Sequence, residues 1–308
     1  MIDASLKTDV TSTPQIPLST RLGPVHLAVT GRDKALAIWR DVVGLTILEE
    51  DAQKIVLGAG GKPLIVLEPG AERAVMQRSL GLYHVAIHVP TRADLAHMAV
   101  RALTRNVRIS PTDHLVSEAI YLWDLDGNGI EITFETPWRG RLADPETGHY
   151  ALTADGRPHS GRDPIDLEDL LAEIDPLQPQ PAMPAGTRIG HIHLHVSDLR
   201  RAMDFYRDAL GFAGFLLIDS FGMGDVGLDY MPHTIAFNIW SGPRATQPPE
   251  GTAGLRHFTI ALPDAASREA VRERLMAAGA PVSESGDLLV TEDPFGNRIR
   301  LAVFAPAE

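Results

Sequence analysis

The amino-acid sequence predicts an α+β protein built from four copies of one small module, and three observations lead to this prediction. Two distant segments, Val25–Leu45 and Ile192–Phe212, align without a gap, and each reads as an alternating apolar strand, a charged turn and a helical stripe. A second pair, Gly81–Val107 and Gly254–Ala280, matches in the same way. Both members of that second pair are followed by a Gly-Asn turn and one more apolar strand.

The repeat gives the expected elements in chain order. One helical stripe consists of Ala35, Ile38, Trp39 and Val42, and its counterpart consists of Ala202, Phe205, Tyr206 and Ala209. Gly44 and Gly211 follow these helices, where a left-handed helix end is common. The modules span about residues 22–70 (module 1), 81–137 (module 2), 188–242 (module 3) and 254–304 (module 4). Four strand-rich modules are too few for a solenoid, so we expect them to pair as half-barrels.

The stretch between modules 2 and 3 is rich in proline and glycine and contains one short helix candidate, Leu167–Ile174. We expect a linker or lid there rather than a core element. The predicted organisation is a flexible arm (1–20), a first two-module domain (21–137), a linker (138–187) and a second two-module domain (188–308).

Composition limits the classes of function. Of the 308 residues, 44% are apolar and 22% are charged, and the formal net charge of -12 disfavours nucleic acid and anionic membranes as partners. The absence of cysteine excludes disulfides, thiolate metal sites and a cysteine nucleophile. No apolar run approaches the roughly 18 residues of a membrane helix, and Met1–Thr20 lacks a signal-peptide core, so a cytoplasmic protein is expected. The 12 histidines are candidate metal ligands.

Modules that open with a His-x-Ala strand and continue into an aromatic helix ending in Leu-Gly-Phe resemble the vicinal oxygen chelate superfamily. That superfamily contains glyoxalase I, bleomycin-resistance proteins and extradiol ring-cleavage dioxygenases. The resemblance covers nearly the whole chain outside the arm and the linker, and it implies four βαβββ modules that pair into two open barrels. Because this fold hosts several chemistries, the module pattern alone does not indicate the reaction.

The segment Thr112–Glu131 is more specific, because it resembles the signature of extradiol dioxygenases. The signature positions are occupied by His114, Tyr121, Asp124, Gly127 and Glu131. Leu125 stands where that family usually has proline, a residue that shapes a turn and takes no part in the chemistry. The segment is most similar to that of the two-domain catechol 2,3-dioxygenases.

The resemblance implies a metal site of two histidines and one carboxylate, with the histidines on first strands and the carboxylate on a last strand. The matching first-strand positions of the four modules are Pro24, His84, His191 and His257, and the last strands of modules 2 and 4 offer Glu131 and Arg300. Only modules 2 and 3 together supply a full set, namely His84, His191 and Glu131. We therefore expect modules 2 and 3 to form the metal-holding barrel and modules 1 and 4 a metal-free one, with His26 as a decoy. Fe(II) is the expected ion, and Mn(II) suits the same ligands.

The resemblance also assigns roles to three further side chains. His233, in the segment Pro232–Phe237, matches the acid/base histidine of extradiol enzymes. Tyr121 would hydrogen-bond a substrate oxygen, although core packing is an alternative for it, and His114 would orient a substrate hydroxyl. His193 and His195 alternate with His191, so they share its face of the strand and could contact substrate. Candidates for lining an aromatic pocket, with core packing as the alternative, are Trp123, Phe134, Phe237 and Trp240.

The expected function is extradiol ring cleavage, with a small aromatic diol and O2 as partners and with neither nucleic acid nor a membrane. A glyoxalase-like isomerase or lyase is one alternative, but such sites usually add a second carboxylate, and the last strand of module 3 offers Asn238 instead. A non-catalytic binding protein of the same fold is another alternative, and such proteins generally lack the metal ligands. Exposed module edges are compatible with a homo-oligomer.

Overall fold

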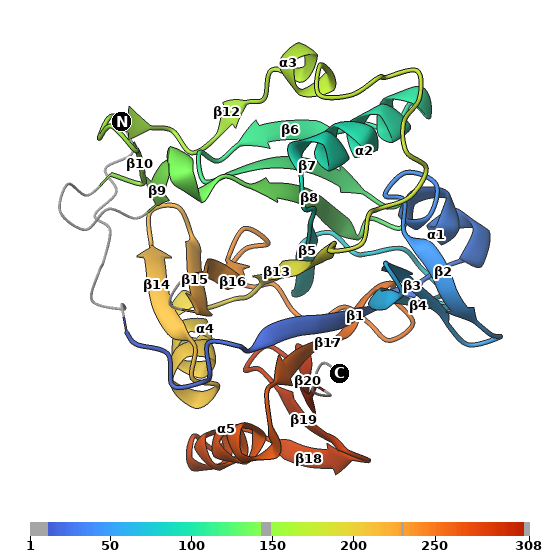
Figure 1. The fold of residues 1–308 in the computed structure, drawn as a ribbon. Helices are drawn as coiled ribbons and strands as arrows, with labels where there is room; N and C mark the ends of the chain where they lie inside the picture. Colours follow the sequence, from blue (N-terminus) through green and yellow to red (C-terminus); the bar gives the residue numbers. More distant parts are fainter. Residues whose placement is uncertain (1–11, 143–148, 229–230, 305–308) are drawn as a thin grey trace.

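Two large mixed sheets, of eight and nine strands, dominate the computed structural model, which describes residues 12–142, 149–228 and 231–304 (Figure 1). The fold is α+β, as the sequence predicts. Residues 1–11 of the expected arm lie outside the described residues. From Ser12 on, the arm is held in place, because backbone amides of Ser12, Gln15 and Ile16 donate to the carbonyl oxygens of Gly214 or Gly211. These bonds join the described part of the arm to two backbone carbonyl groups of module 3.

All four predicted modules are present. Module 1 contains β1 (Arg21–Val29), α1 (Arg32–Trp39), β2 (Thr46–Glu50), β3 (Ile55–Ala59) and β4 (Lys62–Pro69). Module 2 contains β5 (Gly81–His88), α2 (Arg92–Thr104), β6 (Ser110–Asp113), β7 (Ser117–Trp123) and β8 (Gly129–Glu135). Module 3 contains β13 (Arg188–His195), α4 (Leu199–Met203), a π-helical turn (Asp204–Ala209), β14 (Ala213–Ile218), β15 (Met223–Leu228) and β16 (Met231–Asn238). Module 4 contains β17 (Gly254–Leu262), α5 (Ala265–Ala277), β18 (Val282–Ser285), β19 (Leu288–Glu292) and β20 (Arg298–Val303).

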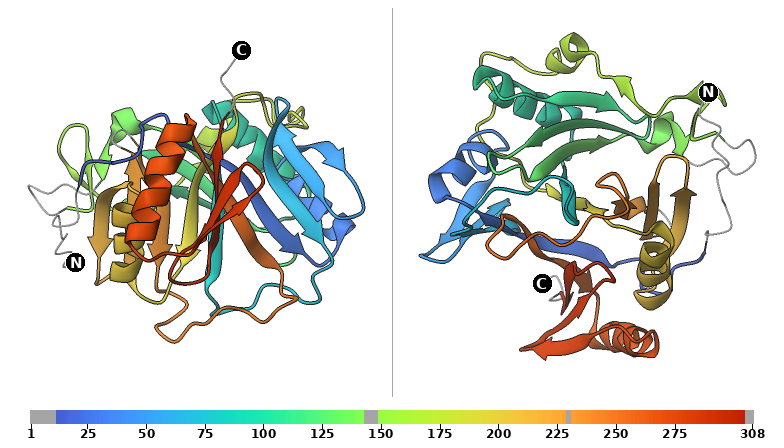
Figure 2. Two further views of the ribbon diagram at one scale, coloured as in Figure 1. Left: turned by 90° about the horizontal axis from the view of Figure 1, so that it is seen from below. Right: turned by 180° about the vertical axis from the view of Figure 1, so that it is seen from behind.

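The modules pair in the nested order that the ligand tally predicts. The eight-stranded sheet runs β18-β19-β20-β17-β1-β4-β3-β2, so it joins modules 4 and 1. The nine-stranded sheet runs β12-β6-β7-β8-β5-β13-β16-β15-β14, so it joins modules 2 and 3. Both are open, curved sheets, and Figure 2 shows the first and last modules side by side. Consequently the consecutive module pairs, 21–137 and 188–308, each contribute strands to both sheets.

Consecutive modules are joined by an arginine that packs on a helix-ending glycine, and the first of these arginines, Arg101, is buried. Gly44 and Gly211 have φ of 91° and 96°, the left-handed conformation expected for them. The Arg101 side chain, from α2, donates to the carbonyl oxygens of Val42 and Val43 at 2.9 and 2.7 Å. Arg274, from α5, donates in the same way to Leu210 at 2.9 Å. A guanidinium therefore satisfies the free carbonyl groups at the end of the preceding module's helix.

We expect Gly44→Ala to destabilise the protein by roughly 2–4 kcal/mol, because it combines left-handed strain with a collision. A Cβ at Gly44 would lie 2.7 Å from Nη2 of Arg101. Gly61→Ala is the matched control, since Gly61 has φ of 76° but a Cβ there would meet nothing within 4 Å. That control should cost only about 1 kcal/mol in urea unfolding. Equal costs for the two variants would contradict the packing role of Arg101.

The Gly-Asn turns before β8 and β20 are a repeated structural device. Oδ1 of Asp124 accepts hydrogen bonds from the backbone amides of Asp126 and Asn128, both at 2.9 Å, and Oδ2 accepts one from Nε1 of Trp39 at 3.1 Å. Asp293 repeats this arrangement in module 4 and accepts from the Tyr206 hydroxyl at 2.7 Å. Each turn thus anchors the aromatic side chain of the preceding module's helix. Asp124 and Gly127 belong to the extradiol-like segment for this structural reason, and they lie outside its chemistry.

The segment between modules 2 and 3 is more structured than a linker. It contains a 3-10 turn (Pro137–Arg139), β9 (Gly140–Leu142), β10 (Ala151–Thr153), β11 (Pro158–His159), β12 (Asp163–Pro164) and α3 (Leu167–Leu171). The helix candidate is confirmed as α3, which packs on α2, and Leu170 is fully buried in the main core. β12 extends the nine-stranded sheet beyond β6. Among the described residues, no helix has both the length and the apolar character needed to cross a membrane.

Candidate metal centre

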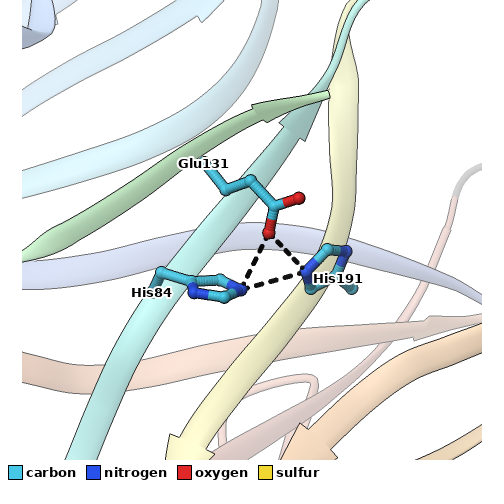
Figure 3. A group of neighbouring side chains, drawn as sticks. All are labelled: His84, Glu131 and His191. Carbon is cyan, nitrogen blue, oxygen red and sulfur yellow. Dashed lines mark hydrogen bonds and ion pairs between the residues drawn. The ribbon is translucent and has the colours of Figure 1, made fainter. Parts of the chain in front are cut away.

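Three buried side chains from three adjacent strands meet at one point on the nine-stranded sheet (Figure 3). Nε2 of His84 lies 2.9 Å from Oε2 of Glu131 and 3.1 Å from Nε2 of His191, and Nε2 of His191 lies 3.0 Å from the same carboxylate oxygen. His84, Glu131 and His191 are exposed by only 4%, 2% and 7%. They are the three residues predicted as metal ligands.

Strand register explains why these side chains converge. β5 and β13 are antiparallel neighbours, with His191 opposite Ala86 and His193 opposite His84. β8 runs parallel to β5 on its other side and places Glu131 beside Ala86. Because alternate residues of a strand share a face, His84, Ala86, His191 and Glu131 all point into the same concavity. The pairing of module 2 with module 3 therefore completes the set.

The charge states of this cluster suit metal binding. Burial lowers the pKa of His191 to about 3, so its imidazole is neutral at pH 7. Burial alone would raise the pKa of Glu131, but His191 and His84 outweigh burial and hold that pKa well below its ordinary range. Glu131 also accepts a hydrogen bond from the hydroxyl of Thr133 at 2.9 Å. The result is a buried, ionised carboxylate beside imidazole nitrogens, a set of donor atoms that suits a cation.

The spacing of the three atoms also fits an ion with open positions. Two ligands at right angles about an ion at about 2.1 Å lie roughly 3.0 Å apart, whereas tetrahedral ligands would lie roughly 3.4 Å apart. The observed separations of 2.9, 3.0 and 3.1 Å match the first case. Three ligands on one face leave the opposite face free, which is the arrangement of two-histidine-one-carboxylate iron sites. The residues present therefore fit Fe(II) or Mn(II).

His233 lies beside this cluster and is held by a carboxylate that the sequence prediction missed. Its ring centroid is 4.7 Å from that of His191, and its Nδ1 is 2.7 Å from Oδ2 of Asp225 on β15. Burial lowers the pKa of His233, but the hydrogen bond and the charge of Asp225 outweigh burial, so the pKa lies above its ordinary value. His233 has φ of 69°, the left-handed region, and Asp225 is 3% exposed.

Tyr121 and His114 form a hydrogen-bonded pair on the other side of the cluster. The Tyr121 hydroxyl lies 2.9 Å from Nε2 of His114, and Nδ1 of His114 donates to the carbonyl oxygen of Gly161 at 2.7 Å. Burial lowers the pKa of His114 and raises the pKa of Tyr121 well above its ordinary value. Neutral His114 thus accepts a hydrogen bond from the Tyr121 hydroxyl through Nε2. Gly161 comes from the segment expected to be a linker or lid, so that segment orients a site residue.

Two further histidines line the concavity with a tyrosine that sequence reasoning did not single out. Asn238 is fully buried, and its amide donates to Nε2 of His193 at 2.9 Å while its oxygen accepts from Nδ1 of His195 at 2.8 Å. The ring of Tyr83 packs 4.9 Å from His84 and 5.0 Å from both of these histidines. The one sequence feature that points to Tyr83 is that it directly precedes His84, a predicted metal ligand. Asn238 occupies the position at which a glyoxalase-like isomerase is expected to have a carboxylate. Its side chain instead holds the imidazoles of His193 and His195 in place by hydrogen bonds.

Comparison with known proteins gives the family. A curated protein of Bacillus subtilis (strain 168), catechol-2,3-dioxygenase, is 35% identical over 280 residues, which cover 89% of this chain and 94% of that protein. The family model for the glyoxalase/bleomycin resistance protein/dioxygenase superfamily matches residues 188–301. The chain belongs to this superfamily.

Solved structures of this superfamily share the fold. Glyoxalase I from Zea mays superimposes with a TM-score of 0.56 at 15% identity, covering 92% of each chain. A provisionally assigned dioxygenase from Bacillus subtilis subsp. subtilis str. 168 gives a TM-score of 0.60 at 14% identity, covering 93% of this chain and 86% of that one. At these identities the likeness concerns the fold alone.

In the eight-stranded sheet, the positions that correspond to the candidate metal ligands are occupied by other residues. Arg300 lies beside Thr259 on β17 as Glu131 lies beside Ala86 on β5, and Pro24 stands where module 3 has His191. His26 stacks on His257 with ring centroids 3.9 Å apart, and Nδ1 of His26 is 3.1 Å from Glu68. Within the described residues, the only metal-competent cluster is that of His84, Glu131 and His191. His26, which is expected from the sequence to lie outside the metal site, is thus part of a stacked pair of imidazoles.

The buried His257 predicts a loss of stability in acid. Burial, followed by the nearby His26 and Arg300, lowers the pKa of His257 to about 3, against about 6.5 in an unfolded chain. Above pH 6.5 neither state binds the proton, but as the pH falls from 6.5 towards 3 the unfolded state binds it and stability is lost. The slope of the unfolding free energy against pH reports how many more protons the unfolded state binds. In urea unfolding between pH 3 and 6.5, His257→Gln should reduce that slope by the equivalent of up to one bound proton. An unchanged dependence would contradict the shift.

Proposed function

We propose that this protein is an extradiol dioxygenase that uses Fe(II) and O2 to open a catechol-type ring. The observation that carries the proposal is the cluster of three buried donor atoms from His84, Glu131 and His191. These atoms lie 2.9–3.1 Å from one another, so all three can contact one ion from the same side. Two acid/base-capable groups, His233 and the Tyr121–His114 pair, flank that point. The name of the 35% identical Bacillus subtilis protein, catechol-2,3-dioxygenase, supports the same reaction.

His84, Glu131 and His191 would hold the ion. Ferrous iron, when bound there, supplies a site where a catecholate and O2 can meet and exchange electron density, and Mn(II) suits the same donors. The protein contributes a negative carboxylate and two imidazoles, so the filled site retains one positive charge. That charge favours a deprotonated diol as the partner of the open face.

His233 is positioned to take a proton from one substrate hydroxyl. Because Asp225 accepts a hydrogen bond from Nδ1–H, the lone pair of the neutral imidazole resides on Nε2. Asp225 also stabilises the imidazolium that forms when the proton arrives. The same nitrogen can return the proton when the ring opens, as a general acid. Asp225 thus has the role of a positioning residue.

Tyr121 is positioned to orient the diol. Since its hydroxyl proton is donated to His114, the phenolic oxygen keeps lone pairs that can accept a hydrogen bond from a substrate hydroxyl. The bond from His114 to Gly161 fixes the tautomer of that histidine. The diol would bind between Tyr121 and His233, with its oxygens directed towards the metal held by His84, Glu131 and His191.

The test is anaerobic reconstitution with Fe(II), followed by catechol and air. We expect a yellow ring-opened product and the consumption of one O2 per catechol. Glu131→Ala and His191→Ala should abolish both signals, and His26→Ala should retain them. Loss of product with His26→Ala and its retention with His191→Ala would refute the proposed site. Iron binding without product from any substituted catechol would refute the proposed reaction, and a parallel series with Mn(II) identifies the active ion.

A further inference from the structure

We propose that a cleft between the two sheets binds the substituent of the substrate, and that the preferred substrates are catechols carrying a second aromatic ring. This inference rests on the proposed ring cleavage for its substrate and on an independent cavity for its location. The cleft has a volume of about 520 Å³. That is within the ~300–1,000 Å³ of pockets for drug-sized ligands and exceeds the need of one six-membered ring.

The cleft lies where the two inter-module connections run together. The chain after β4 and the chain after β16 pair with each other, through the amide of Glu72 to Gly251 at 2.7 Å and that of Leu80 to Thr246 at 3.0 Å (Figure 2). The starts of β5 and β17 and the Gly-Asn turns of modules 2 and 4 complete its walls. Modules 2, 3 and 4 and the two connections therefore contribute to one cavity.

A short series of aromatic rings in tilted or edge-on contact leads from the metal ligand His84 to this cleft. Tyr83 and Trp240 line the cleft. The Tyr83 ring lies 4.9 Å from that of His84, and the Trp240 ring lies 5.5 Å from that of His193 and 5.2 Å from that of Tyr83. The Tyr83 ring thus lies both on the wall of the cleft and against the ring of His84 in the candidate metal centre. A planar group attached to a diol at the metal would pass Tyr83 to enter the cleft.

Three large apolar side chains among the polar walls of the cleft offer surface to an aromatic group. Met76, Trp123 and Trp240 are exposed by 43%, 47% and 41%, and all three line the cleft. Exposed large apolar side chains that gather in one concavity are typical of a ligand site. The charged residues that line the cleft are Arg78, Arg256 and Glu250, so both signs of charge are present, with two cations to one anion. Aromatic rings stack favourably on indoles, which makes a second ring the best match.

The test compares Trp123→Ala with the wild type on catechol, 3-phenylcatechol and 4-phenylcatechol. Trp123 is at the end of β7, opposite Gly129 rather than Glu131, so the variant addresses the cleft. The kcat/KM of the better phenylcatechol relative to catechol should fall about 10-fold. Trp138→Ala is the matched control, because Trp138 is 66% exposed and lies outside the cleft. Its ratio should stay at the wild-type value.

A second measurement separates the cleft from the reaction. Biphenyl-4-ol has one hydroxyl and cannot undergo extradiol cleavage, so its binding to metal-free protein can be followed by calorimetry. We expect Trp123→Ala to weaken that binding about 10-fold and Trp138→Ala to leave it unchanged. Binding that depends on Trp123 without ring opening of any catechol would support the cleft and refute the proposed reaction. Ring opening with an unchanged selectivity ratio in Trp123→Ala would overturn the cleft proposal and leave the reaction standing.

Discussion

Glu131→Gln is expected to lower ring-cleavage activity at least about 1,000-fold, equivalent to roughly 4 kcal/mol of transition-state stabilisation. Glu131 provides the negative donor of the cluster, and a neutral amide is a much weaker ligand for a divalent ion. The amide also places N–H groups near the lone pairs of His84 and His191, whose Nε2 atoms lie 2.9 and 3.0 Å from the carboxylate oxygen. Metal content after reconstitution, together with oxygen uptake, is the measurement.

Arg300→Gln is the matched control for this variant. Arg300 holds the register position of Glu131 in the other sheet, and the two variants create the same side chain. Arg300→Gln should keep the wild-type metal content and activity. Full metal loading and activity in Glu131→Gln would exclude this cluster as the metal centre.

His233→Asn is expected to lower kcat by about 100- to 10,000-fold while metal binding is retained, because it removes the general base without touching a ligand. Asparagine is chosen because it tolerates the left-handed backbone at this position, where φ is 69°. Single-turnover measurement of product formation, with metal content as the control, tests the prediction. A variant that loses its iron would indicate that His233 supports the ligands rather than the proton transfer.

The partner of His233 provides the stricter test. Asp225→Asn keeps the side-chain shape but removes the charge that lies 2.7 Å from the imidazole. It should lower kcat less than His233→Asn does, and the double variant should be no slower than His233→Asn alone. Additive losses would show that the two residues act independently, contrary to the proposed positioning role.

The elements that were predictable from the sequence are those with a strong repeat. The apolar helical stripes that end at Gly44 and Gly211 recur in modules 1 and 3, and the Gly-Asn turns recur in modules 2 and 4. These repeats predict the four modules and the two glycine helix ends. Module pairing was inferred from ligand complementarity, since neither Pro24 nor Arg300 can serve as a ligand. The convergence of His84, Glu131 and His191 then depends only on strand alternation and register, both of which follow from that pairing.

The missed parts lack local periodicity. β9, β10, β11 and β12 are two or three residues long, too short to show an alternating pattern among prolines and glycines, and so the contact of Gly161 with His114 was not foreseen. Asp225 sits in the glycine-containing strand β15, with no motif around it. The ring of Tyr83 reaches His193 because β5 and β13 change register near that point. Such irregularities are set by tertiary packing rather than by local preference.

The nested pairing of the modules has a consequence for the order in which the protein is built. Synthesis proceeds from the N-terminus, so modules 2 and 3, adjacent in the chain, can pair while module 4 is still being made. The strands that carry His84, Glu131, His191 and His233 all lie within that inner pair. Module 1 must wait, its strand β1 unpaired on one side, until β17 emerges. We therefore expect the candidate metal centre to assemble early during synthesis, and the cleft between the sheets to close last.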